Sequence, residues 1–204
     1  MKRVITAIAL GLTALSFDGC GSIFPKPIPS RLFALSSLPS TGTADRSGQI
    51  SLGIGPVRLP GYLDRQEIVT RVAENRFDLF EYDRWAEPLD ENLTRVLTQN
   101  LSILLRTDQL VAYPWPIDKK PHYRVELQVL RFESNSAREA ELAARWAVID
   151  ETGKEAPNLK ESRLTRPAKE KSIDAAVAAL SETVADLSRE IAKTVTAIDR
   201  ERGP

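Results

Sequence analysis

The sequence predicts an α+β protein, a two-layer sandwich whose mainly antiparallel or mixed sheet carries two helices on one face. Two long segments, residues 89–105 and 173–198, repeat apolar residues at helical spacing. Several shorter segments before and between them alternate apolar and polar residues, as half-buried strands do. Elements that each have one apolar face bury it by stacking in layers, so helices packed on a sheet are expected.

The stretch 76–105 joins a strand to the first helix through a short aromatic corner at residues 83–88. Pro88 fits the first helical position, because an N–H there would have no partner within the helix. Asp90 and Glu91 suit the positive end of the helix dipole. We therefore expect a strand, a tight corner and a helix of about five turns that folds back on the sheet.

The other strands are expected where alternating segments lie between turn residues. They are placed at residues 31–35, 50–57, 67–72, 110–113, 123–133, 140–149 and 159–165. Ser134, Asn135 and Ser136 form a turn between the two longest of these segments, which are therefore predicted to pair as a hairpin.

The last helix begins after Ser172, a favoured N-cap residue, and has Asp174 in its first turn. Its apolar residues recur at intervals of three and four over more than three heptads. This spacing is compatible with a coiled-coil seam and with a long helix laid across the sheet, and we expect the latter.

The N-terminus is typical of a secretory signal, because two basic residues precede an apolar stretch that is short for a membrane span. Cys20 follows, and its surroundings resemble the lipobox of bacterial lipoproteins, which implies acyl chains on this cysteine. Gly19 fits the box, whereas Phe17 and Asp18 depart from it. The residue after the cysteine is Gly21, whereas many lipoproteins that stay at the inner membrane have an aspartate there. This difference favours sorting to the outer membrane. The alternative is an ordinary secretory signal with a free cysteine.

Four regions follow from this interpretation. We expect a lipoprotein signal peptide at 1–19, a tether containing one short strand at 20–49, a single α+β domain at 50–199 and a tail at 200–204. Proline, serine and glycine dominate most of the tether, as in linkers. Acyl chains on Cys20 would contribute ~0.8 kcal/mol of membrane anchoring per buried methylene.

The composition argues against several classes of function. The 28 basic and 28 acidic residues balance, so no broad basic face for nucleic acid is expected. One cysteine and one histidine, His122, offer no zinc site of the usual composition, and no nucleotide-binding or nucleophile motif is present. Carboxylate pairs such as Glu139 with Glu141 fit the wet face of a strand. We therefore predict no enzyme, no metal and no cofactor other than the acyl chains.

The aromatic corner is the candidate contact surface, because tyrosine, tryptophan and arginine dominate binding hot spots. We assign Arg65, Arg84 and Trp85 to partner binding. The structural alternative places Trp85 as a lid over the start of the helix, with Asp83 as its N-cap or as the ion-pair partner of Arg84.

Several linked motifs resemble one family, the auxiliary lipoproteins of ABC-type transport that are typified by paraquat-inducible protein C (PqiC). The resemblance runs over residues 31–198 and rests on residues 55–60, 62–65, 68–71, 84–89, 113–116, 123–125, 130–132 and 144–146. It implies a lipoprotein on the periplasmic face of a Gram-negative outer membrane, without catalytic activity. Its partner would be an MCE-domain protein of the PqiB type that bridges the periplasm for lipid traffic, and the domain would act as a docking platform.

Two other functions remain open at this stage. A periplasmic lipid carrier would bind lipid itself and would need a large apolar cavity, and an envelope enzyme would need converging polar groups. A homo-oligomer is a further hypothesis, motivated by the long C-terminal helix and the edge-prone strands.

Overall fold

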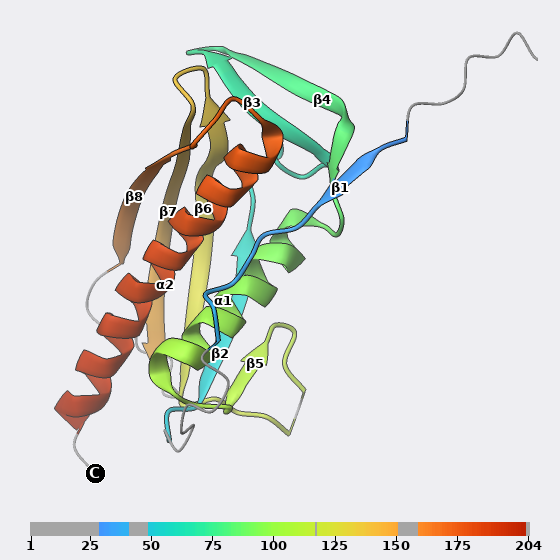
Figure 1. Cartoon of the computed structure of the whole chain (residues 1–204). Coiled ribbons are helices and arrows are strands. Elements are labelled where there is room, and N and C mark those ends of the chain that lie inside the picture. The colour runs from blue at the N-terminus through green and yellow to red at the C-terminus, as the bar shows by residue number, and fades with distance from the viewer. Residues whose placement is uncertain (1–28, 41–48, 117, 151–158, 203–204) are drawn as a thin grey trace, which may run out of the picture.

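The computed structural model describes residues 29–40, 49–116, 118–150 and 159–202, which form one mixed sheet and two helices (Figure 1). The elements are β1 (Arg31–Phe33), β2 (Leu52–Arg58), β3 (Glu67–Ala73), β4 (Arg76–Trp85), α1 (Leu89–Leu105), β5 (Leu110–Ala112), β6 (Tyr123–Asn135), β7 (Glu139–Asp150), β8 (Lys160–Pro167) and α2 (Ile173–Arg202).

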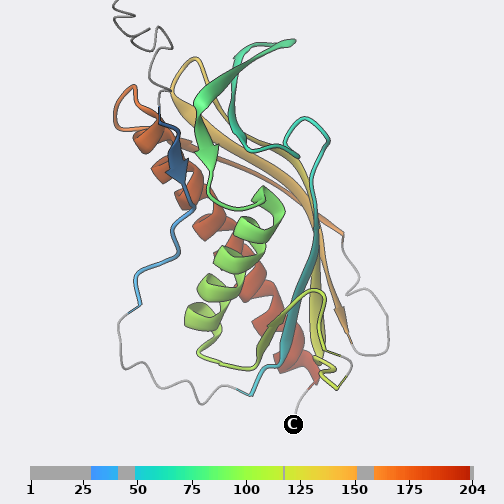
Figure 2. The same ribbon diagram turned by 90° about the vertical axis from the view of Figure 1, so that its right-hand side faces the viewer.

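The predicted α+β architecture is confirmed, and both helices lie on the same face of the curled sheet (Figure 2). The first helix occupies the predicted residues, and each predicted strand is present with ends shifted by a few residues. Two details differ. β4 continues through Trp85, so the corner begins at Ala86, and Pro88 is the N-cap of α1 rather than its first helical residue, with φ −49° and ψ 136°.

β6 is the central strand of the sheet. On one side it pairs with β7 in the predicted long hairpin, from Tyr123–Asp150 to Ser134–Ala140. On the other side its first half pairs in parallel with β2, and its end pairs in parallel with β3. Only Thr70 and Arg71 of β3 are in register with β6, so the β3–β4 hairpin leaves the sheet almost at once.

The core lies between the sheet and the helices. Trp146, Phe132 and Leu142 of the sheet are less than 2% exposed and face apolar residues of both helices. α2 contacts α1 and strands β6, β7 and β8, so it lies across the sheet as expected. Its apolar residues Leu180, Val184, Leu187, Ile191 and Val195 are fully buried. Each such side chain stabilises the fold by roughly 1.5–3 kcal/mol relative to an exposed position.

Residues 34–40, here called the strap, run over the two helices (Figure 2). Leu35 is 3% exposed and belongs to the core. Its N–H donates to Asn92 Oδ1 of α1 at 3.2 Å, and the N–H of Ser36 donates to Ser181 Oγ of α2 at 3.1 Å. The strap falls within the region 20–49 that the sequence suggested as a tether, yet the described part of that region contacts both helices.

A buried amide joins the strap to both helices. Asn100 of α1 is 0% exposed, and its Oδ1 accepts the N–H of Leu38 at 2.7 Å. Its Nδ2 donates to Ser188 Oγ of α2 at 3.1 Å. Buried polar groups need such partners, because an unpaired one costs about 1–3 kcal/mol. Asn100 therefore sets where the strap lies along the helices.

We predict that Asn100→Ala lowers the free energy of unfolding by about 2–4 kcal/mol, because it leaves a strap N–H and a buried hydroxyl without their partner. Denaturant unfolding followed by circular dichroism measures this change. Chymotrypsin should also cut the loosened strap after Leu35, because the bond between Leu38 and Pro39 resists this protease. Gln99→Ala, at the exposed neighbouring position, is the matched control. Equal stability and equal cleavage of the two variants would contradict the proposed role of Asn100.

Candidate functional site: the β3–β4 arm and the free edge of β4

The β3–β4 hairpin, residues 67–85, projects beyond the rest of the sheet and is here called the arm (Figure 1). β3 and β4 pair with each other from Ala73–Arg76 to Glu67–Arg84. A two-stranded hairpin alone is marginally stable in water. Contacts at the base of the arm must therefore hold it in place.

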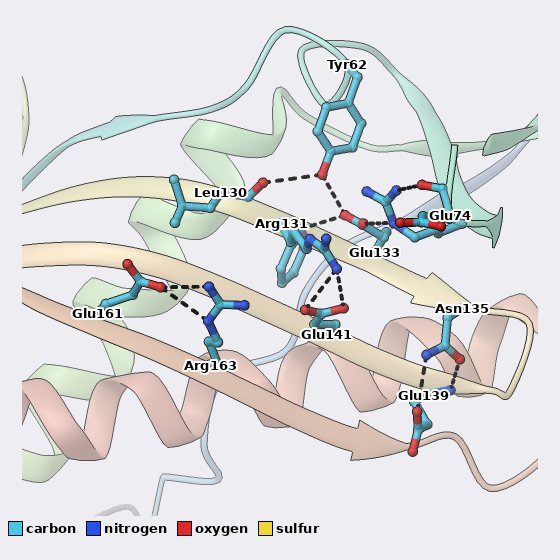
Figure 3. A network of polar contacts seen from close by, with 12 residues as sticks. Tyr62, Glu74, Leu130, Arg131, Glu133, Asn135, Glu139, Glu141, Glu161 and Arg163 are labelled. Carbon is cyan, nitrogen blue, oxygen red and sulfur yellow. Dashed lines mark hydrogen bonds and ion pairs between the residues drawn. The ribbon is translucent and has the colours of Figure 1, made fainter. Parts of the chain in front are cut away.

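A buried carboxylate holds one side of the base. Glu133 of β6 is 1% exposed and lies on the face of the sheet away from the helices (Figure 3). Arg71 Nε of β3 donates to Glu133 Oε1 at 2.8 Å, and the hydroxyl of Tyr62 donates to Glu133 Oε2 at 2.7 Å. The N–H of Phe132 also donates to Oε2, at 2.9 Å. We call Tyr62, Arg71 and Glu133 the Glu133 cluster.

Aromatic stacking extends the Glu133 cluster onto the arm. The ring of Tyr62 stacks on that of Phe77 with centroids 4.7 Å apart, and the guanidinium of Arg71 lies 4.3 Å from the centroid of Phe77. Burial raises the pKa of the Tyr62 hydroxyl, and so do its hydrogen bond to Glu133 and the negative charge of that carboxylate. Tyr62 therefore remains protonated and keeps donating well above neutral pH.

An ion pair holds the other strand of the arm. Arg31 of β1 donates to both carboxylate oxygens of Asp83, at 2.7 and 2.9 Å, and Asp83 is 6% exposed. The expected roles of Asp83 as N-cap or as partner of Arg84 are wrong, because the residue lies inside β4, where β1 pairs alongside it. Arg84 instead donates to the carbonyl of Glu81 at 3.3 Å.

The outer edge of β4 is unpaired over residues 76–82 within the part of the chain that the structure describes, because β1 pairs only with Asp83–Trp85. The N–H of Ala86 donates to the carbonyl of Phe33, so the backbone groups of Phe33 face β4. Every second residue of a strand directs its backbone groups to the same side, so position 29, four residues earlier, would also face β4. This position is Pro29, which has no N–H to donate. Because β1 begins only after this proline, the rest of the β4 edge has no partner strand among the described residues.

Apolar side chains accompany this free edge. Leu79 is 48% exposed and Tyr82 is 41% exposed, while Phe77 and Phe80 are half-buried. Proteins usually protect an edge strand with charges, prolines or a covering element, because its free N–H and C=O groups pair readily with another strand. An edge that keeps large apolar side chains is the geometry used to bind an extended segment by strand addition.

The three predicted contact residues all lie at the base of the arm, but they differ in how far their side chains are exposed to solvent. Glu67 is in register with Arg84, and the N–H of Trp85 donates to the carbonyl of Gln66, so Arg65 lies nearby in sequence and in space. Arg65 is exposed and Arg84 is partly exposed. Trp85 is 6% exposed and packs near Phe132, with centroids 6.4 Å apart. Its ring is part of the core and cannot belong to an exposed contact surface.

The sequence interpretation missed the Glu133 cluster. Its members come from a loop and two strands, and Arg71 and Glu133 are 62 positions apart. No sequence signal singled out Glu133, because it follows Phe132 on the outer face of β6, where polar residues such as Glu126 are ordinary. Cys20, the predicted lipidation site, lies outside the described residues.

The remaining candidates for chemistry have ordinary surroundings. His122 is exposed. Glu141 pairs with Arg131 at 3.3 Å, and Glu139 hydrogen-bonds to Asn135 (Figure 3). Among the described residues, no three histidine, cysteine or acidic side chains gather as a metal site would require. Neither helix in this part of the chain has an apolar stretch long enough to cross a membrane.

Comparison with solved structures supports the fold. Protein XCC0632 from Xanthomonas campestris, of family-model DUF330, has a TM-score of 0.70 and 14% identity, covering 86% of this chain and 100% of its own. A second crystal structure, of an uncharacterized protein, has a TM-score of 0.69 and 19% identity, covering 82% of this chain and 99% of its own. At these identities the likeness concerns the fold. No curated protein matches the chain.

The family model of the ABC-type transport auxiliary lipoprotein component matches residues 33–192. The chain belongs to this family. Membership suggests a membrane-anchored envelope protein that assists transport and has no catalytic role.

We predict that Tyr62→Phe destabilises the protein by about 1.5–3 kcal/mol at neutral pH, because it removes a hydrogen bond to a buried carboxylate. The raised pKa of Tyr62 adds a pH dependence. Its contribution is complete below the ordinary tyrosine pKa of about 10 and is lost as the pH rises above it, because the unfolded chain then releases a proton that the folded chain keeps.

Unfolding by denaturant at pH 7, 9 and 10.5 tests this prediction. The difference between wild type and Tyr62→Phe should be constant up to pH 9 and smaller at pH 10.5. Tyr113→Phe, at a position that is 52% exposed, is the control. A Tyr62→Phe protein as stable as this control at every pH would show that the hydroxyl does not hold the arm.

Proposed function

We propose that the chain is a non-enzymatic outer-membrane lipoprotein that docks a periplasm-spanning MCE-domain protein of the PqiB type for lipid transport between the membranes. Acyl chains on Cys20 hold it at the periplasmic face. Membership of the transport auxiliary lipoproteins supports the class of function. The proposal adds the membrane, the partner and the surface that binds it.

The free edge of β4 is the observation that carries the docking role. An extended segment of the partner would pair with the backbone of residues 76–82, and Leu79 and Tyr82 would contact its side chains. Arg65 and Arg84, at the base of the arm, would contact polar groups beside this segment. Backbone pairing provides affinity, and the apolar contacts select the partner.

The contacts at the base of the arm make it suitable for this role. Asp83 and Glu133 are buried carboxylates, and each is held by an arginine from a different strand. A docking strand that is ordered before binding loses less conformational freedom on association than a flexible one. The arm therefore presents its edge in the form that the partner requires.

The alternative function, a carrier that shuttles lipid, has one observation in its favour. A cavity of about 730 Å³ lies under the arm. It is at one end of the molecule, whereas the space between sheet and helices is occupied by the core. Docking therefore remains the proposed main function.

We predict that Leu79→Lys lowers capture of the MCE-domain protein by about tenfold or more, the effect of losing ~1.4 kcal/mol of binding free energy. A lysine on an edge strand opposes pairing with a further strand. Tagged protein is recovered from detergent-solubilised envelopes, and its partners are identified and quantified by mass spectrometry. Circular dichroism verifies that the variant is folded.

Leu159→Lys is the matched control, because Leu159 is 64% exposed and lies beside β8 rather than on the arm. Cys20→Ala tests the anchor in the same experiment and should lose both acylation and membrane attachment. Capture of the MCE-domain protein at wild-type level by Leu79→Lys would contradict docking on the β4 edge. Absence of this protein from every sample would contradict the proposed partner.

A further inference from the structure

The chain that directly precedes β1 could cover the free edge of β4. β1 lies beside the end of β4 and runs parallel to it, with Arg31 opposite Asp83 (Figure 1). A continuation of β1 toward the N-terminus would therefore follow β4 back along residues 76–82. Residues 24–30, here called the pre-strand segment, are equal in number to these edge positions.

A strand from the same chain would be a strong competitor for this edge. Its pairing would be intramolecular, and a segment on a short linker has an effective concentration in the millimolar range. A partner segment that arrives from solution would have to displace it. An edge that serves docking therefore has to be kept free of its own chain.

Three prolines in the pre-strand segment remove the donors that such pairing needs. The carbonyl of Phe33 accepts the N–H of Ala86, so the backbone groups of Phe33 face β4. Every second residue of a strand directs its backbone groups to the same side, so positions 25, 27 and 29 would face β4 if β1 continued. These positions hold Pro25, Pro27 and Pro29, and proline has no N–H.

The other residues of the pre-strand segment cannot replace these donors. Each of them has an N–H, but a continued β1 would direct it away from β4. The first residue that both faces β4 and has an N–H is Arg31, and Arg31 is where β1 begins. The observed start of the strand therefore agrees with the proline pattern.

Pairing without these donors is weak. In a parallel pair, a residue whose backbone faces the neighbouring strand donates one hydrogen bond and accepts one. Prolines at all such positions remove half of the hydrogen bonds of a continued β1 and leave the facing carbonyls of β4 without a donor. For the same reason, proline in sheets is confined to strand starts, edges and bulges.

We propose that Pro25, Pro27 and Pro29 prevent the chain before β1 from extending β1 along β4, and so reserve the edge for a partner strand. This inference rests on the docking role proposed above and adds how the docking edge avoids its own chain. The prolines do not hinder the partner, because a partner strand brings its own N–H groups.

A second explanation of the prolines is a stiff spacer between the membrane anchor and the domain. A spacer depends on the number of prolines and not on which side of a strand they would face. The two explanations therefore differ in what they predict for the edge of β4 when the prolines are replaced.

The test replaces all three prolines in the full chain, as Pro25→Thr, Pro27→Thr and Pro29→Thr, here called the proline variant. Threonine restores the N–H and favours strands. Residue-resolved hydrogen exchange is measured on the purified protein in detergent micelles. We expect the edge amides within residues 76–82 that exchange quickly in the wild type to exchange at least about tenfold more slowly, because they become hydrogen-bonded.

Capture of the MCE-domain protein should fall by a similar factor. The pairing that protects the edge amides also lowers the fraction of molecules that can accept a partner strand, and apparent affinity falls with this fraction. The amides of α1 should exchange as in the wild type, which verifies that the fold is unchanged.

The matched control carries Phe24→Thr, Lys26→Thr and Ile28→Thr and keeps the prolines. It has the same number of threonines in the same segment, at positions that would face away from β4. We expect wild-type exchange along residues 76–82. Unchanged exchange in the proline variant, or equal protection in the control, would overturn the inference.

A failure of this inference and a failure of the docking proposal are distinguishable, because hydrogen exchange is measured without a partner. Edge amides that become protected while capture of the MCE-domain protein stays at the wild-type level would support the role of the prolines. The same result would contradict docking on the β4 edge.

Discussion

The buried carboxylate of Glu133 is the constraint on which the presentation of the arm depends. A charge with 1% exposure is tolerated only when it is paired and hydrogen-bonded. Arg71 and Tyr62 satisfy this requirement, and to do so β3 and the loop before it must meet β6. Because β3 is in register with β6 at only two positions, this polar cluster fixes a hairpin that backbone pairing alone would hold weakly.

The two helices could be predicted because apolar residues spaced three and four apart identify both a helix and the face that it buries. Residues 89–105 and the start of α2 after Ser172 follow directly from that pattern and from capping. The strand order could not be predicted, because alternation identifies the buried face but not the neighbouring strand. The parallel pairing of β2 and β3 with β6 and the position of the strap on Asn100 depend on tertiary contacts between residues distant in sequence.

The three residues assigned to partner binding differ in their surroundings. Arg65 and Arg84 lie at the base of the arm, and their part in partner binding stays a prediction. Trp85 is inside, because β4 continues into the expected corner and brings this ring to Phe132. The unpaired edge of β4 depends on where β1 begins. That position could be explained only after the structure showed that the backbone of Pro29 would face β4. The proposed docking function therefore depends on an ordered arm whose strand β4 is unpaired along its outer edge.

Residue-resolved hydrogen exchange of the free protein tests this claim most directly. Along residues 76–82, we expect alternate amides to exchange slowly, because they are bonded to β3, and the intervening ones to exchange quickly, because they face solvent. In Arg71→Ala, which leaves Glu133 buried without its cation, all of these amides should exchange quickly while those of α1 stay protected. Uniformly fast exchange in the wild type would show that the arm is not ordered before binding. Uniformly slow exchange would show that its edge is already covered.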